Sequence, residues 1–191
     1  YPELTLSPTD ARHRETIKRF TINMQRYIHI YAMYVGYPNG DFFEVANMES
    51  AAVLHAHFKA PPKTRWTIIK IFDSSQGRVR QFEYLDDALK LISTRSEPSE
   101  YLANKRPWYK QAHQSDNVIR TDPYLFSNLQ KNGVTFAKVI DGSRAILAID
   151  FTLQRLNAFL YEQKFDPSSK IMMFGRDGSV IASSERQAPD K

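Results

Sequence analysis

Short turn dipeptides separate the apolar stretches of this 191-residue sequence, and they constrain its fold more than any other feature. Asn39-Gly40, Asn132-Gly133 and Asp141-Gly142 each lie between runs rich in the aromatic and β-branched residues that favour strands. Turns this short join antiparallel strands, whereas parallel strands need a long crossover connection. The sequence therefore predicts an α+β fold with a central antiparallel sheet of about five to six strands, flanked by helices.

A helix is predicted near the start of the chain. Residues 7–10 read Ser-Pro-Thr-Asp, which supplies an N-cap, a proline at the first helical position and a capping box. The residues that follow carry an apolar stripe at helical spacing, and we expect this stripe to face the core: Ile17, Phe20, Met24 and Ile28.

Two later segments, 86–99 and 152–163, are also predicted to be helical. A last hairpin is predicted over 171–182, around a second Asp-Gly turn. A lone hairpin is at best marginally stable, so this one must pack on a neighbour or belong to a further module. We therefore expect residues 1–164 to form one domain, with residues 165–191 beginning another.

The composition excludes several classes of function. Lys and Arg total 26 and are scattered among 21 acidic residues, so the net charge of +5 does not predict a nucleic-acid partner. Cysteine is absent, which excludes disulfides and thiolate metal sites. The chain has no G-x-S-x-G, P-loop or H-E-x-x-H motif, so neither catalysis nor a cofactor is predicted.

His55 and His57 form an H-x-H pair. On a strand, both rings would point to one face and could bind a metal ion. No third ligand lies near them in the sequence, so two surface histidines are the favoured interpretation and no metal site is predicted.

The run from Tyr101 to Tyr109 concentrates the residues that could bind a small molecule. Its pattern is Y-x-x-x-x-R-x-W-Y, with Arg106 and Trp108 between the two tyrosines. A guanidinium group offers a planar fork of donors for a carboxylate, and the rings supply apolar walls. A buried aromatic cluster with Arg106 stacked on Trp108, and no ligand, accounts for the same residues equally well.

The motifs in this part of the chain resemble those of the double-Cache family, the extracytoplasmic sensor domains of bacterial receptors. The resemblance rests on the run 101–109, the Asp122-Pro123-Tyr124 step and a hydrophobic strand ending at Asp150 before a helix. The strand at Tyr34-Val35-Gly36 and its Asn39-Gly40 turn also fit the family's first hairpin. The resemblance implies a PAS-like fold for most of the chain.

The domain expectation takes a specific form under this resemblance. Residues 1–164 would be the membrane-distal Cache domain, without the family's long N-terminal helix, and residues 165–191 the first hairpin of a truncated membrane-proximal module. The membrane anchors would lie outside this sequence, and the domain would be periplasmic. A homodimer is left open as a partner arrangement.

The resemblance also implies a set of ligand contacts. Arg106 and Trp108 would hold a ligand carboxylate, helped by Tyr101 or Tyr109, while the ammonium group would be held by the two remaining positions, Tyr124 and Asp150. Amino-acid binders usually carry an Asp two residues after the Pro-Tyr tyrosine, but this chain has Phe126. A methylated amine or an organic acid is therefore as plausible as an amino acid. Asp150 could instead be an N-cap or first-turn charge of the following helix.

The resemblance implies a sensor that signals to a cytoplasmic output domain. Output domains in the family include HD-GYP phosphodiesterases, diguanylate cyclases and histidine kinases, and the strand and turn over residues 34–43 most resemble ectodomains attached to HD-GYP or nucleotide-cyclase outputs. The alternative is a structural or dimerising ectodomain that binds no small molecule.

Overall fold

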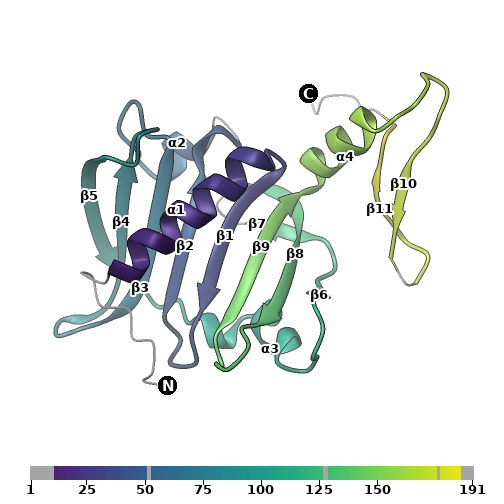
Figure 1. Cartoon of the computed structure of the whole chain (residues 1–191). Coiled ribbons are helices and arrows are strands. Elements are labelled where there is room, and N and C mark those ends of the chain that lie inside the picture. Colours follow the sequence, from purple (N-terminus) through teal and green to yellow (C-terminus); the bar gives the residue numbers. More distant parts are fainter. Residues whose placement is uncertain (1–10, 51–52, 127–128, 176, 186–191) are drawn as a thin grey trace.

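A computed structural model describes residues 11–50, 53–126, 129–175 and 177–185 (Figure 1). Its main sheet has nine strands in the order β5-β4-β3-β2-β1-β9-β8-β6, with β7 pairing beside β6 on β8. Every pairing in it is antiparallel. The strands are β1 (Ile30–Gly36), β2 (Phe42–Asn47), β3 (Trp66–Ser74), β4 (Gly77–Leu85), β5 (Leu91–Pro98), β6 (Ile119–Arg120), β7 (Tyr124–Phe126), β8 (Lys131–Val139) and β9 (Ile146–Thr152).

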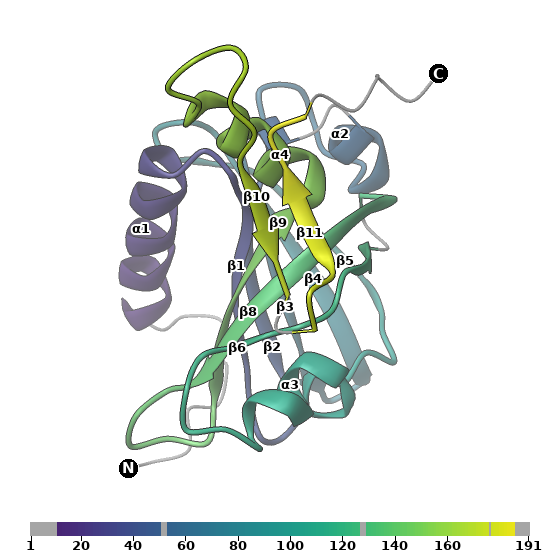
Figure 2. The ribbon, with the colours of Figure 1, turned by 90° about the vertical axis from the view of Figure 1, so that its right-hand side faces the viewer.

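Helices cover both faces of the sheet. The helix α1 lies across one face, and α3 lies beyond the other (Figure 2). The predicted α+β class and antiparallel sheet are confirmed, although the sheet is wider than expected because β5 and the short β6 and β7 join it. The helical segments are α1 (Ala11–Arg26), η1 (Met48–Ser50), α2 (Val53–His57), η2 (Ala103–Lys105), α3 (Pro107–Ala112) and α4 (Leu153–Glu162).

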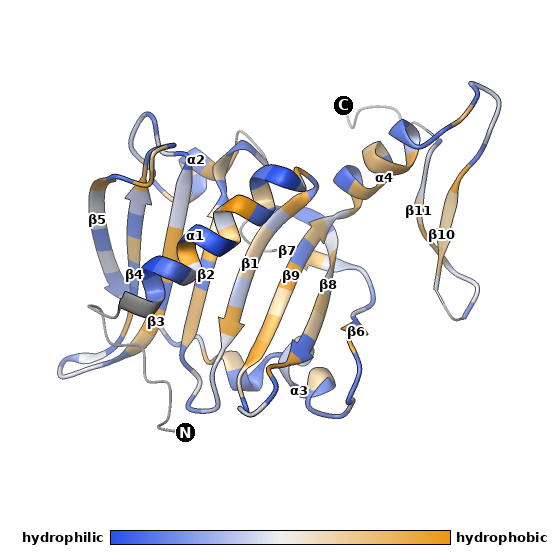
Figure 3. Cartoon of the chain, in the orientation of Figure 1, coloured by the Kyte–Doolittle hydropathy of each residue, from blue (hydrophilic) through white to orange (hydrophobic). Residues whose placement is uncertain are grey.

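The central strand β1 is buried along its whole length because both of its faces are covered. Met33 and Val35 pack in the cluster beneath α1, whereas Tyr34 points to the opposite face. The strands in the middle of the sheet are correspondingly the more hydrophobic ones (Figure 3). Alternation along β1 thus divides the core into two layers.

The predicted stripe of the first helix is confirmed in part. Ile17, Phe20 and Met24 are buried against the sheet, but Ile28 is 52% exposed. The expectation for Ile28 is wrong because α1 ends at Arg26, so the helical spacing no longer applies. The predicted cap at residues 7–10 lies outside the described residues.

Two of the three predicted turns in the main sheet are confirmed. Gly40 and Gly142 have φ angles of 91° and 73°, which glycine adopts without strain. The turn at Asn132-Gly133 is wrong, because both residues lie inside β8. Gly133 is needed there for close packing, since a Cβ atom would lie 2.2 Å from Cε2 of Phe126.

The helix predicted over residues 86–99 is also wrong. Residues 91–98 form β5, which pairs with β4 at the edge of the sheet. The polar residues that suggested a surface helix instead form backbone hydrogen bonds with β4, and their side chains point alternately to solvent. The helix predicted over residues 152–163 is confirmed as α4.

The predicted last hairpin is present as a two-stranded sheet of β10 (Met172–Phe174) and β11 (Val180–Ser183). It packs on α4 through Ile181 and Ala182, which contact Leu156 and Leu160 in one buried cluster. The hairpin therefore gains its stability from α4. Its assignment to a second Cache module remains a prediction.

None of the helices in the described part of the chain combines the length and apolarity required for crossing a bilayer.

Replacing Gly133 with alanine should destabilise the fold. The new methyl group would clash with the Phe126 ring and lie 2.6 Å from the Phe151 carbonyl oxygen, so β7, β8 or β9 must shift. We expect a loss of about 1–3 kcal/mol in the free energy of unfolding, measured by urea denaturation. Asn132→Ala, at the exposed neighbouring position, should change it by less than about 0.5 kcal/mol. Equal stability of the two variants would contradict this packing.

Candidate functional site

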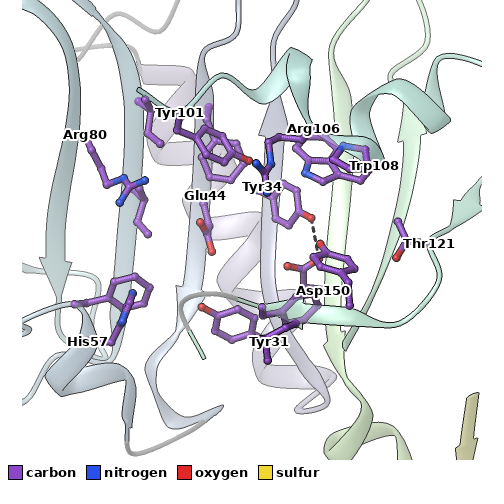
Figure 4. Close-up of a pocket in the computed structure, with 18 of the residues that line it drawn as sticks. Tyr31, Tyr34, Glu44, His57, Arg80, Tyr101, Arg106, Trp108, Thr121 and Asp150 are labelled. Atoms are coloured by element: carbon purple, nitrogen blue, oxygen red, sulfur yellow. Dashed lines mark hydrogen bonds between the residues drawn. The ribbon is translucent and has the colours of Figure 1, made fainter. Parts of the chain in front are cut away.

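A cavity of about 540 Å³ lies on the face of the sheet opposite α1 (Figure 4). Its floor is formed by side chains of β1 to β4 and β9, and its walls by the segment 101–111 and by residues 121–126. The volume is in the range of small-molecule sites. All but one of the six predicted ligand contacts line it: Tyr101, Arg106, Trp108, Tyr124 and Asp150.

Asp150 is the centre of a chain of hydrogen bonds at one end of the cavity. Its Oδ1 accepts from the Tyr34 hydroxyl at 2.8 Å and from Thr135 Oγ1 at 2.6 Å. Because the single Thr135 proton is used in this way, the Tyr124 hydroxyl must donate to Thr135, at 2.7 Å. No residue of the described ranges donates to Asp150 Oδ2 within hydrogen-bonding distance. As far as the described residues go, one carboxylate oxygen therefore remains available to a ligand.

The alternative role for Asp150 as a helix cap is wrong. Thr152 is the N-cap of α4, and its hydroxyl accepts from the Arg155 backbone N–H at 3.2 Å. Asp150 lies two residues earlier on β9, with its side chain turned to the cavity face of the sheet. The strand alternation that buries Ala148 and Asp150 together decides this orientation.

Burial raises the pKa of Asp150 to about 7, and the hydrogen bonds from Thr135 and Tyr34 limit the rise. Burial and the nearby Asp150 carboxylate also raise the pKa of Tyr34 well above its ordinary value. Tyr34 therefore remains a protonated donor to Asp150. A cation bound at Asp150 would favour the ionised carboxylate and release a proton.

Glu44 is a second buried acid in the cavity, and the sequence analysis missed it. It lies on β2 and is 6% exposed. Burial, followed by the Asp150 carboxylate, raises its pKa to about 8, while Arg80 opposes the rise. The only sequence signal was an acid in a strand, at the same parity as the cavity-facing Phe42 and Ala46.

Arg106 lies at the mouth of the cavity, at the N-cap position of α3 (Figure 4). Its guanidinium carbon is 5.4 Å from the centre of the Tyr101 ring, a cation–π contact. Among the described residues, no carboxylate forms an ion pair with it. The alternative with Arg106 stacked on Trp108 is therefore not what the structure shows, and the guanidinium fork remains available.

Trp108 forms an aromatic wall behind Arg106. Its indole meets the Tyr34 ring edge-on, with ring centres 5.1 Å apart. Gly36 makes this approach possible, because a Cβ atom there would lie 2.6 Å from Trp108 Cη2. The aromatic cluster predicted from the sequence exists, and it encloses a cavity.

Tyr109 does not line the cavity. Its hydroxyl donates to the Arg144 carbonyl oxygen at 2.9 Å, which anchors α3 to the loop between β8 and β9. Of the two tyrosines predicted to assist Arg106, only Tyr101 is therefore placed where it could do so. Consecutive residues of a helix point in different directions, so Trp108 lines the cavity while Tyr109 packs elsewhere in the core.

Phe126 is buried and contributes to the cavity wall near Asp150. Its ring is 6.1 Å from that of Tyr31 and 4.9 Å from that of Tyr124. The position at which the resemblance leads one to expect an Asp therefore carries an aromatic wall in place of a charge.

The far end of the cavity carries paired charges. Arg80 and Arg95 both form ion pairs with Glu97, and Arg95 also lies 4.0 Å from the centre of the Phe82 ring. His57 lines this end, but His55 does not. The H-x-H pair lies on α2 and not on a strand, so its two rings do not share a face.

No family model matches this sequence. The sensory domain of the Campylobacter jejuni chemoreceptor Tlp3 superposes with a TM-score of 0.51 and 15% identity, over 90% of this chain and 52% of that one. The ligand-binding domain of the Pseudomonas fluorescens chemoreceptor CtaA, in complex with L-serine, gives a TM-score of 0.51 and 17% identity, over 97% and 57% of the two chains. This chain shares the fold of these two chemoreceptor domains. The predicted fold is confirmed.

A curated relative is adenylate cyclase 1 of Rhizobium meliloti (strain 1021), which is 24% identical over 183 residues. The match covers 94% of this chain but 27% of the relative. The chain thus spans about a quarter of that protein and about half of the chemoreceptor domains.

The stability of the unliganded protein should fall as pH rises from about 4.5 to about 8. In this window the folded state retains protons on Asp150 and Glu44 that the unfolded state, with ordinary pKa values of 3.8 and 4.5, has lost. Each group contributes at most about 1.4 kcal/mol per pH unit. Thermal midpoints measured across this range should show the fall, and Asp150→Asn and Glu44→Gln should each flatten it. Parallel curves for wild type and both variants would contradict the raised pKa values.

Proposed function

We propose that this chain is an extracytoplasmic sensor domain whose cavity binds a small carboxylate- or amine-bearing molecule. The observation that carries the proposal is that one cavity is lined both by Arg106, which forms no ion pair with a described carboxylate, and by the buried carboxyl group of Asp150. A buried carboxylate such as Asp150 is costly unless a cation pairs with it, whereas the exposed Arg106 offers its donors at the cavity mouth. A zwitterionic or charged ligand would pair both.

The carboxylate of the ligand would be held by Arg106. The fork of guanidinium donors can make two parallel hydrogen bonds to a carboxylate. Tyr101 already lies against the guanidinium, and Trp108 closes the space behind it. These two rings limit the directions in which Arg106 can point, which reduces the entropy lost when a ligand binds.

The amine of the ligand would be held by Asp150 Oδ2, which no described side chain occupies. The rings of Tyr31, Tyr124 and Phe126 line the same cavity as Asp150 and can offer cation–π faces. Such faces tolerate methyl groups on nitrogen, so a methylated amine and an amino acid both suit this end. An organic acid would use Arg106 alone.

The solved relatives support a ligand of this size. The CtaA domain that superposes on this chain was crystallised with L-serine. A scaffold without a ligand is the alternative function. The buried Asp150 side chain argues against it, because it lines the cavity with one oxygen that accepts no hydrogen bond from the described residues, an arrangement that a scaffold would not need.

Signalling would follow from domain closure around the ligand. A ligand shifts an equilibrium between two arrangements only if it binds one of them more tightly. The wall segment 101–111 and the floor strands contribute contacts from different elements, so closure would change their relative position. We propose a periplasmic location, with membrane anchors outside this sequence. Residues 165–191 would begin a membrane-proximal module, and the domain could form a homodimer.

The output domain is proposed to be a cytoplasmic enzyme. The curated relative described above is an adenylate cyclase, which favours a nucleotide-cyclase output. An HD-GYP phosphodiesterase stays a prediction from the sequence alone.

Thermal-shift measurements against amino acids, methylated amines and organic acids should identify a compound that raises the midpoint by mass action. At 100 times the dissociation constant, the stabilisation is about 2.7 kcal/mol. Arg106→Ala should abolish the shift for a carboxylate ligand while preserving the unliganded midpoint, because Arg106 lies exposed at the cavity mouth.

Lys105→Ala is the matched control, since it removes the neighbouring positive charge outside the cavity lining. It should retain the full shift. An equal shift in Arg106→Ala would place the ligand elsewhere, and the failure of every compound to shift wild type would favour the scaffold function.

A further inference from the structure

Glu44 is a buried acid on the cavity floor. Its side chain is 94% buried, given its exposed fraction of 6%, and within the described ranges it accepts no hydrogen bond and forms no ion pair. Arg80, the cation that acts on the Glu44 carboxyl group electrostatically, forms its ion pair with Glu97 instead, with 3.6 Å between their charged atoms. A buried carboxyl group with neither hydrogen bond nor counter-ion is costly, so it requires an explanation outside the described contacts.

The sheet register separates Glu44 from the proposed amine position at Asp150. Tyr34 on β1 pairs with Glu44 on one side and with Ala148 on the other, whereas Asp150 pairs with Ala32. The two acids are thus two strand spacings apart, about 10 Å, and offset by two residues, about 7 Å, on the same face. A single ammonium group held by Asp150 cannot also reach Glu44.

The surface between the two acids is apolar. Tyr34 lies between them in the register, and its ring packs against Phe42 and Trp108. Ile69 pairs with Glu44 on the other side and also lines the cavity. Two acids joined by a hydrophobic strip match a molecule with two cationic nitrogens joined by methylene groups.

We propose that Glu44 binds a second cationic nitrogen of the ligand, so that the cavity selects a basic amino acid or an aliphatic diamine. This inference rests on the proposed sensor function and specifies its ligand class. The ammonium at one end pairs with Asp150, the methylene chain crosses Tyr34, and the far ammonium pairs with Glu44. Arg106 adds a carboxylate contact that only the amino acid can use.

L-lysine and L-norleucine test the proposal, because they differ by one ammonium group at the end of a chain of equal length. Calorimetric titration of wild type should show lysine binding at least tenfold more tightly than norleucine. Glu44→Gln should bring the two affinities within about twofold of each other by weakening lysine alone. Glu44→Leu, which keeps an apolar side chain of similar size, should reverse the preference.

Glu83→Gln is the matched control. It makes the same chemical change on the same sheet, but Glu83 faces away from the cavity and pairs with Lys70 at 2.5 Å. This variant should retain the wild-type ratio of lysine to norleucine affinity. Cadaverine distinguishes the two ligand types. An affinity equal to that of lysine indicates a diamine site, and a weaker affinity indicates an amino-acid site. Either result supports the proposal if the binding depends on Glu44.

The proposal fails if wild type binds norleucine as tightly as lysine, or if Glu44→Gln leaves their ratio unchanged. In both cases a ligand still binds, so the sensor function stands while its specificity is reassigned. If wild type binds none of the three compounds, the proposed ligand class is overturned. The wider thermal-shift panel then decides the sensor function separately.

Discussion

The hydrogen-bond chain that ends on Asp150 is the interaction on which the candidate site depends. It joins four strands, because Tyr34, Asp150, Thr135 and Tyr124 lie on β1, β9, β8 and β7. Each hydroxyl proton has an assigned acceptor, so the carboxylate is held in one orientation with Oδ2 directed away from its protein donors. The short strand β7 thereby brings Tyr124 and Phe126 to the cavity wall.

The two faces of the sheet have separate tasks. Under α1, the side chains are mainly apolar, and Met24, Phe43 and Trp66 are fully buried. On the other face, charged groups of both signs lie among aromatic rings around the cavity. The apolar packing beneath α1 stabilises the fold, and this stabilisation offsets the desolvation free energy of the acids buried on the opposite face.

Local patterns predicted much of this arrangement, and their failures have physical reasons. Arg106, Trp108 and Asp150 were expected at the site because the short motifs that contain them resemble those of a known sensor family. Residues 91–98 could not be recognised as a strand, because their pairing with β4 is a contact between different segments. Glu44 was missed for the same reason. An acid within a strand can be recognised as a site residue only when the sheet register, which places Glu44 opposite Tyr34, is known.

The sequence by itself determined the antiparallel sheet and the positions of α1 and α4, because turns and helical periodicity are local properties. Its motifs also named residues that could bind a charged ligand, through their resemblance to a known family. Only the tertiary structure decided which of those residues share a cavity. It packed Tyr109 in the core outside the cavity lining, set Arg106 against Tyr101, and placed Glu44 and Asp150 on one floor. These outcomes depend on strand register and on packing between distant segments, which no short stretch of sequence encodes.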